Sequence, residues 1–211
     1  MHSKSLFISL FSLAALVSYT TAHAVIISAQ GDGGKGSQLG GPTGYALGVD
    51  LSTPRNGAAV SPHQRDTTIF SQRSMNLWKD CGQTLQSGVI DVNSLTSKLV
   101  SKGSIPQVSP GGSLFMVLHQ INGSGNGPFV CGIDKTGEGT KYSSLTVTRQ
   151  VPGQSPTPNA VKTKQFPFQV AMPSDLKCTG KFGGKSNICT IRCQNFATSG
   201  PFGGCIPVQV V

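Results

Sequence analysis

Residues 113–121 read SLFMVLHQI, and their alternation decides the fold. Leu114, Met116 and Leu118 fall on one face of an extended chain, and the residues between them, ending at His119, fall on the other. A period of two is typical of a β-strand that packs one face against a core. We therefore expect a strand over 114–121, with His119 near its end and a glycine-rich loop directly after it.

Other stretches of the chain predict the same class of structure. Five more segments are rich in β-branched and aromatic residues and predict strands: 25–29, 144–151, 166–172, 187–194 and 206–211. One short helix is predicted over 92–100, with Asp91 as its N-cap, Leu95 and Leu99 on one face, and Gly103 beyond its end. The 27 glycines and 13 prolines are spread along the chain, as in turns between strands. We expect an all-β, immunoglobulin-like β-sandwich with long loops.

Two polar segments predict long loops. Residues 30–44, QGDGGKGSQLGGPTG, are expected to be too glycine-rich to pack, and they match neither the dinucleotide-binding nor the P-loop fingerprint. Residues 153–159, GQSPTPN, predict a second loop rather than a domain boundary. No internal repeat is present, so 23–211 is expected to form a single domain.

The first residues have the features of a secretory signal peptide. Lys4 supplies the positive start, and 6–17 form an apolar run that is too short to span a bilayer. Small residues at Thr20 and Ala22 fit cleavage before His23, which gives a signal peptide of 1–22. The A-x-A pattern ending at Ala24 fits cleavage two residues later. We expect a secreted, extracellular protein without a membrane span.

Cysteine content and charge agree with secretion. Six cysteines predict three disulfides, with 15 possible pairings: Cys81, Cys131, Cys178, Cys189, Cys193 and Cys205. The net charge of +9 is dispersed along the chain, which argues against nucleic-acid binding and fits an anionic cell-wall or host surface. Asn122 begins an N-glycosylation sequon. We expect a monomer.

Familiar catalytic patterns do not occur in the sequence. Glu138 is the only glutamate, and no carboxylate pair marks a glycosidase. There is no G-x-S-x-G motif, and each cysteine has a possible disulfide partner. After cleavage before His23, three histidines would remain, and His63 lies in a polar turn. The α-amine and ring of His23, together with the ring of His119, would form a histidine brace, an all-nitrogen ligand set that suits one copper ion.

Several longer blocks resemble a known family. GSLFMVLHQINGSGNGPFVCGID (112–134) and CTIRCQNFATSGPFGGCIPVQ (189–209) resemble secreted fungal proteins described as appressorial-penetration or haustorium-associated virulence factors. HAVIISAQGDGG (23–34), ALGVDLSTPRNG (46–57) and DTTIF (66–70) resemble the same family. The resemblance implies a fungal protein secreted at a host or substrate surface during penetration.

A more distant resemblance is to the copper-dependent lytic polysaccharide monooxygenases, whose mature chains begin with a histidine. It implies that His23 and His119 bind copper and that Phe202, three residues before Cys205, lies beside the axial position. Gly200 stands where the cellulose-active enzymes often carry a glutamine, and Gln194 is the candidate replacement in the outer sphere. The sequence thus predicts a copper protein that oxidises cell-wall polysaccharide. The alternative is a non-catalytic secreted effector or cell-wall-binding virulence factor.

Overall fold

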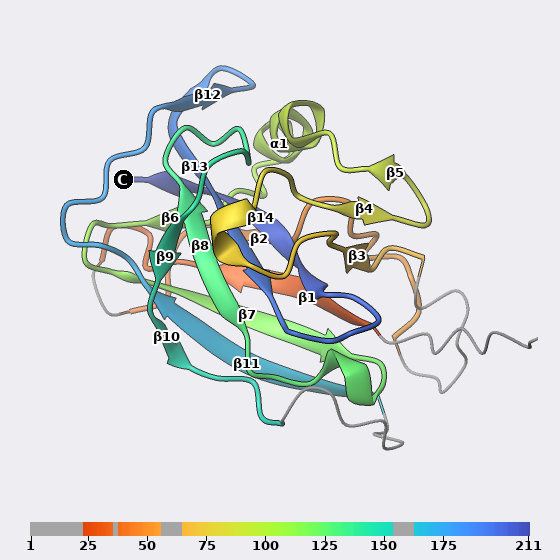
Figure 1. Cartoon of the computed structure of the whole chain (residues 1–211). Coiled ribbons are helices and arrows are strands. Elements are labelled where there is room, and N and C mark those ends of the chain that lie inside the picture. Colours follow the sequence, from red (N-terminus) through yellow and green to blue (C-terminus); the bar gives the residue numbers. More distant parts are fainter. Residues whose placement is uncertain (1–22, 36–37, 56–64, 154–162) are drawn as a thin grey trace, which may run out of the picture.

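A computed structural model describes residues 23–35, 38–55, 65–153 and 163–211. The expected signal peptide, His63 and most of the 153–159 loop lie outside these residues. Figure 1 shows a body made largely of strands, with one α-helix at its periphery. No helix among the described residues is long and apolar enough to cross a membrane.

Six strands of five or more residues build the body. They are β1 (Ala24–Gln30), β7 (Ser113–Gln120), β8 (Val130–Asp134), β11 (Lys164–Ala171), β13 (Lys185–Gln194) and β14 (Phe202–Val210). The shorter strands are β2 (Thr43–Gly44), β3 (Thr68–Ile69), β4 (Gln83–Thr84), β5 (Gly88–Val89), β6 (Gln107–Val108), β9 (Ser143–Leu145), β10 (Val147–Arg149) and β12 (Gly180–Phe182). The helices are α1 (Val92–Ser101) and the 3-10 turns η1 (Met75–Leu77) and η2 (Gly123–Gly125).

The strands form one hydrogen-bonded sheet that folds back on itself. Its main path is β10-β11-β7-β1-β14-β13-β8-β9. Only Thr146 separates β9 from β10 in sequence, so the two ends of this path must lie close together. The rings of Phe129, just before β8, and Phe168, in β11, are 5.7 Å apart although their strands are not neighbours in the sheet. The sheet is therefore sandwich-like and not a closed barrel, which confirms the all-β sandwich prediction.

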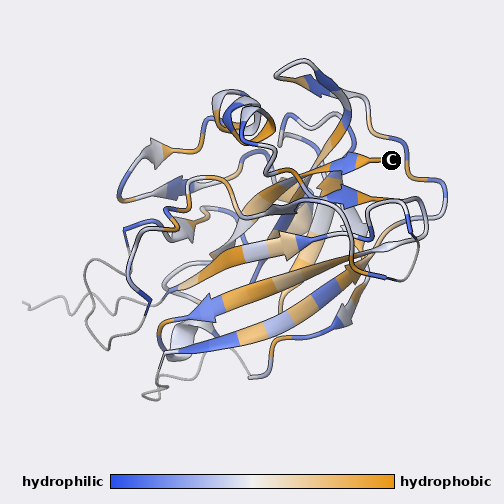
Figure 2. Cartoon of the chain, turned by 180° about the vertical axis from the view of Figure 1, so that it is seen from behind, coloured by the Kyte–Doolittle hydropathy of each residue, from blue (hydrophilic) through white to orange (hydrophobic). Residues whose placement is uncertain are grey.

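Two apolar clusters fill the interior. The main cluster joins the predicted row of β7, Leu114, Met116 and Leu118, to apolar residues of the facing strands. A smaller cluster under α1 contains Leu47 and Leu99. Figure 2 shows that apolar residues concentrate along the central strands, while loops are mostly hydrophilic.

Three disulfides link the strands and loops, as predicted from the cysteine count. The pairs are Cys81–Cys205, Cys131–Cys193 and Cys178–Cys189. Cys131 and Cys193 are directly opposite in the β8–β13 pair. Cys81 and Cys205 both belong to the smaller cluster, so this bridge ties the region under α1 to β14.

The predicted helix is present. Asp91 is its N-cap, and the Asp91 side chain accepts a hydrogen bond of 3.0 Å from the Ser94 amide. Leu99 is buried on the face that packs against the smaller cluster, as its spacing predicted.

The expectation for residues 30–44 was wrong in part, because this segment packs. Asp32 is fully buried, and its carboxylate accepts hydrogen bonds from the Ser109 amide (2.9 Å) and hydroxyl (2.7 Å). Gly31 allows this approach, since a Cβ atom there would lie 1.8 Å from the Gln107 carbonyl oxygen. The glycines permit close packing here instead of preventing it.

The predicted strand 144–151 is divided. Residues of β9 pair with β8, whereas those of β10 pair with β11 at the other end of the sheet. The chain changes partner at Thr146, and the β10–β11 register shifts between Val147 and Arg149. The segment that was predicted as one strand therefore forms two short strands, one at each end of the main strand path.

Candidate metal centre

The first strand of the described chain lies between two strands that come from distant parts of the sequence. β1 pairs antiparallel with β7 on one side and parallel with β14 on the other. Val25 is opposite His119 in β7 and opposite Gly203 in β14. The start of β1 is thus the point at which His23, His119 and Phe202 are brought together.

His23 continues the β1–β7 ladder at its end. Its carbonyl oxygen accepts a hydrogen bond of 3.0 Å from the Ile121 amide. With His23 opposite Ile121 and Val25 opposite His119, the two histidines are diagonal neighbours on one face of the pair. Diagonal positions lie roughly 7–8 Å apart, a separation that long side chains bridge. The sheet therefore brings both predicted metal ligands to one place.

Both imidazoles are well protected. His23 is 3% exposed and His119 is 1% exposed. The His119 side chain lies on the opposite face of β7 from Leu118, as the alternation predicted. Such burial restrains the rotamers of potential ligands, which reduces the entropy lost on binding a metal.

Phe202, the predicted axial neighbour, lies beside the first histidine. Its ring centroid is 5.2 Å from that of His23, and the planes are tilted by 36°. Phe202 begins β14, and Gly203 follows it. A Cβ atom on Gly203 would lie 2.0 Å from the Cys193 carbonyl oxygen, so glycine is needed for β14 to reach β13 at this point. Close strand packing thus sets where the Phe202 ring stands.

The loop after β7 covers the start of β1. The His23 backbone nitrogen donates a hydrogen bond of 3.1 Å to Asn122 Oδ1. A Cβ atom on Gly125 would lie 2.5 Å from the His23 carbonyl oxygen, so the loop rests directly on this residue. The nitrogen that would become the free amine after cleavage is therefore already positioned by a side chain of the sequon.

Asn195 fixes this arrangement and was not predicted. Its Nδ2 donates to the carbonyl oxygens of Ser124 (2.7 Å) and Asn126 (3.0 Å), and its Oδ1 accepts from the Phe202 amide (3.0 Å). One buried amide thus connects the 122–126 loop to Phe202. In the sequence, the only signal for Asn195 is the resemblance block that contains it, because Ser124 and Asn126 lie about 70 residues away in the chain.

Gln194, the candidate outer-sphere residue, belongs to a different set of contacts. Its Nε2 donates to the carbonyl oxygens of Gln72 and Arg73, both at 3.1 Å, and its Oε1 accepts from the Nε (3.1 Å) and a terminal nitrogen (2.6 Å) of Arg192. Both donors and both acceptor positions of this amide are therefore used within the protein. Its outer-sphere role remains a prediction.

Arg192 is the centre of that second set. Its guanidinium carbon lies 3.9 Å from the centroid of Phe70 and 4.5 Å from that of Trp78. A terminal nitrogen donates to the Asp80 carbonyl oxygen at 2.7 Å. Burial lowers the pKa of Arg192 to about 10, so the group stays charged at neutral pH. These contacts anchor the 70–80 segment onto β13.

Gln165 is a polar side chain beside the histidines that the sequence analysis missed. It is directly opposite His119 in the β7–β11 pair, so the two side chains share one face. Gln165 is exposed. The strand prediction for 166–172 began one residue too late to include it.

The predicted histidine brace would use fewer side chains than most metal sites. Within the described ranges, no group of three or more His, Cys, Asp or Glu side chains could hold a metal. A histidine brace needs only two side chains, because an α-amine supplies the third nitrogen. His23 and His119 provide the two imidazoles on adjacent strands, and nitrogen ligands of this type favour copper.

The chain matches the Egh16-like virulence factor family over residues 21–203. It belongs to this family. The Egh16-like chain is 36% identical to the appressoria-specific virulence factor GAS1 of Pyricularia oryzae, over all of this chain and 79% of that protein. It is 31% identical to the appressoria-specific virulence factor GAS2 of the same fungus, over 81% of this chain and 62% of that protein. The match thus spans less than two thirds of GAS2. No solved structure matches the chain significantly.

Proposed function

We propose that this Egh16-like protein is secreted, is cut before His23, and then binds one copper ion through the His23 amine, the His23 ring and the His119 ring. The observation that supports it is the β1–β7 register, which makes the two histidines diagonal neighbours at a protected strand end. The three disulfides and the virulence-factor relatives support secretion by a fungus at a host surface. Copper, when bound, supplies one-electron and oxygen chemistry for oxidising a cell-wall polysaccharide.

The protein's own residues would have distinct roles in this centre. His23 and His119 hold the ion, and Asn122 Oδ1 positions the nitrogen that becomes the amine. Phe202 supplies an apolar ring beside His23 and offers no ligand there. Asn195 restrains Phe202 and the covering loop together. Gln165 places a hydrogen-bonding amide beside His119.

Copper binding is tested on the secreted, processed protein. We expect N-terminal sequencing to return His23 and calorimetry to give one Cu(II) per chain. His119→Ala should abolish tight binding, whereas His63→Ala should leave it unchanged. An extra alanine before His23 is a further control, because it keeps both imidazoles but converts the His23 nitrogen into a peptide nitrogen. It should change the electron paramagnetic resonance spectrum of the bound Cu(II) from that of the wild-type protein.

Two results would contradict the brace. A mature N-terminus at Val25 would remove His23 altogether. A His119→Ala protein that binds Cu(II) with wild-type affinity and an unchanged electron paramagnetic resonance spectrum would exclude His119 as a ligand.

Oxidative activity needs a separate assay. The copper-loaded protein, given a reductant and oxygen or peroxide, should release oxidised oligosaccharides from fungal or plant cell-wall polymers, and His119→Ala should not. If the protein binds copper and a wall polymer but releases no oxidised product, the non-catalytic virulence-factor alternative takes its place.

A further inference from the structure

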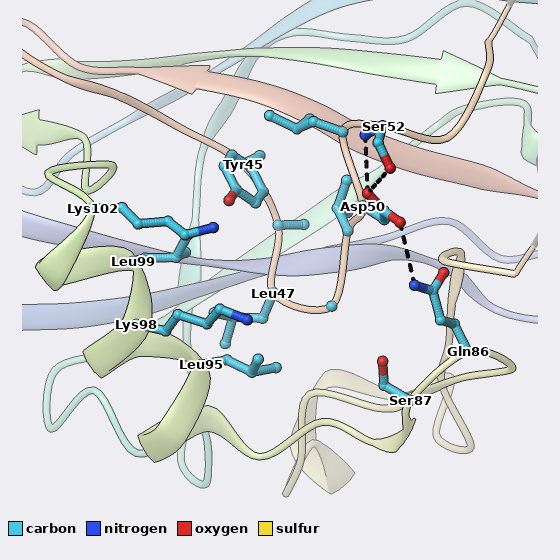
Figure 3. A pocket seen from close by; sticks show the side chains of 14 residues that line it. Tyr45, Leu47, Asp50, Ser52, Gln86, Ser87, Leu95, Lys98, Leu99 and Lys102 are labelled. Atoms are coloured by element: carbon cyan, nitrogen blue, oxygen red, sulfur yellow. Dashed lines mark hydrogen bonds between the residues drawn. The ribbon is translucent and has the colours of Figure 1, made fainter.

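A second concave region lies away from the histidines, between α1 and the segment 45–52. Its cavity has a volume of about 500 Å³, within the roughly 300–1,000 Å³ of small-molecule sites. Figure 3 shows one wall formed by α1 and the opposite wall formed by the loop that carries Tyr45 and Asp50.

Both walls are fixed to the core. The Leu47 amide donates to the Cys205 carbonyl oxygen of β14 at 2.8 Å, and the Ala46 amide donates to the Ile26 carbonyl oxygen of β1 at 3.1 Å. Leu99 of α1 packs in the same apolar cluster as Leu47. The cavity is therefore preformed, so a ligand would lose little free energy in ordering it.

Two lysines make the helix wall cationic. Lys98 and Lys102 are one turn apart on α1, and both are exposed. Within the described part of the chain, neither ammonium group has a carboxylate within ion-pair distance. Both lysines lie near the C-terminal end of α1, where a positive charge interacts favourably with the helix dipole. Figure 3 shows, however, that both side chains extend across the cavity toward the opposite wall. That direction leaves them available to an anionic group.

The opposite wall carries an ordered hydrogen-bond acceptor. Asp50 Oδ1 accepts from the amide (2.9 Å) and hydroxyl (2.6 Å) of Ser52, and Asp50 Oδ2 accepts from Gln86 Nε2 at 3.3 Å. Among the described residues, Asp50 Oδ2 has one hydrogen bond, and it is long, so this oxygen can accept another from a ligand hydroxyl. A negative charge on the ligand would be repelled from this wall.

Apolar side chains line the space between the two polar walls. Leu47, Leu95 and Leu99 form an aliphatic surface, and the ring of Tyr45 stands near the lysines (Figure 3). The cavity therefore combines a cationic wall, an apolar surface and an acceptor wall.

We propose that this cavity binds a hexuronate residue, a pyranose sugar that carries a carboxylate, within an acidic cell-wall polysaccharide. Lys98 and Lys102 would bind the carboxylate, Asp50 would accept from a ring hydroxyl, and the leucines with Tyr45 would contact the C–H face of the sugar. Inorganic phosphate would use only the lysines. A neutral sugar would leave both ammonium groups without an anion.

The test is calorimetry on metal-free secreted protein in the presence of a chelator. The probes are trigalacturonate, its uncharged methyl ester, a glucuronate trimer and inorganic phosphate. We expect the ester and phosphate to bind at least about tenfold more weakly than trigalacturonate. The ester loses the charge-assisted hydrogen bonds to the two ammonium groups, and phosphate lacks the ring that contacts Asp50 and the apolar surface. The glucuronate trimer tells which uronate fits the cavity better.

Substitutions inside and outside the cavity test whether the uronate binds there. Lys98→Gln with Lys102→Gln should weaken trigalacturonate binding at least about tenfold, and Asp50→Asn should weaken it severalfold. Lys79→Gln with Lys177→Gln removes the same charge from exposed positions outside the cavity and should change the affinity less than about twofold. The melting temperature of each variant checks that it is folded.

The proposal is overturned if wild-type protein binds neither uronate trimer, if the ester or phosphate binds as tightly, or if the two lysine pairs lower the affinity equally. Because the protein is free of metal, these outcomes are independent of copper binding. The uronate proposal can therefore be overturned without affecting the histidine-brace proposal, and the histidine-brace proposal can be overturned without affecting the uronate proposal.

Discussion

Asn195 shows how much a single buried side chain can organise. It is fully buried, and besides its two carbonyl acceptors it accepts from the amides of Phe202 and Ala197. Removing this side chain would leave these backbone groups without their partner in a place that water does not reach. The cost of such unsatisfied groups is larger than the net gain of an ordinary surface hydrogen bond.

We therefore expect Asn195→Ala to lower the free energy of unfolding by about 2–4 kcal/mol, measured by urea denaturation at pH 7. Asn93→Ala, at an exposed position of α1, is the control and should stay within about 0.5 kcal/mol of wild type. Equal stability of the two variants would show that Asn195 does not hold the loop to Phe202.

At the scale of the element, the turn between β8 and β9 is built around Asp134. Its Oδ1 accepts from the Thr136 amide (2.8 Å) and hydroxyl (2.7 Å), and its Oδ2 accepts from the amides of Thr140 (2.7 Å) and Lys141 (3.1 Å). Burial raises the pKa of Asp134, but these hydrogen bonds outweigh it, so that the pKa lies below its usual 3.8. The ionised carboxylate is thus the form that the folded turn prefers.

This shift gives a pH dependence with a definite sign. The Asp134 carboxyl binds a proton less tightly in the folded protein than in the unfolded chain. Its contribution to the free energy of unfolding is therefore complete well above pH 3.8 and is lost as the pH falls through the lower pKa that Asp134 has in the folded protein. We expect Asp134→Asn to cost about 1–3 kcal/mol at pH 6–7, and the difference from wild type to shrink below about pH 4. Urea unfolding between pH 7 and 2.5 measures this. A difference that does not change with pH would contradict the assignment.

Elements with a strong local pattern could be predicted from the sequence. The alternation around Met116 predicted β7, and Asp91 with Leu99 predicted α1. β8 was missed because its five residues, VCGID, carry a central glycine and no clear alternation. The strand over 144–151 was divided because the exchange of partners at Thr146 depends on the far side of the sheet.

The candidate site needed information that no local pattern holds. His119 could be identified as the residue that ends the alternating strand just before a glycine-rich loop, and His23 from the cleavage pattern. Their pairing depends on β1 lying beside β7, and the contact of Phe202 with His23 depends on β14 lying on the other side. Asn195 and Asn122 act through hydrogen bonds to distant segments, so sequence spacing gives no signal for them.

At the scale of the whole molecule, the three disulfides close loops of very different length. Cys81–Cys205 spans 124 residues and Cys178–Cys189 spans 11. In the chain-entropy description, the longer loop restricts the unfolded chain more, by about 5 against about 3 kcal/mol.

We expect replacing both Cys81 and Cys205 by alanine to lower the melting temperature more than the same change at Cys178 and Cys189. Thermal unfolding followed by circular dichroism compares the two. A larger loss for the short loop would show that local packing, and not the restriction of the unfolded chain, dominates.

The position of β1 between β7 and β14 also sets the order in which the molecule is assembled. β1 is the first of the described strands to be synthesised, yet its neighbour β14 is the last. Until β14 has emerged and Phe202 has reached His23, the start of β1 has only half of its partners. Pairing across so much sequence is slow to form. The meeting of His23, His119 and Phe202 is therefore completed late in folding, only after β14 has joined the sheet, and a chain that lacks β14 would leave the start of β1 unpaired on that side.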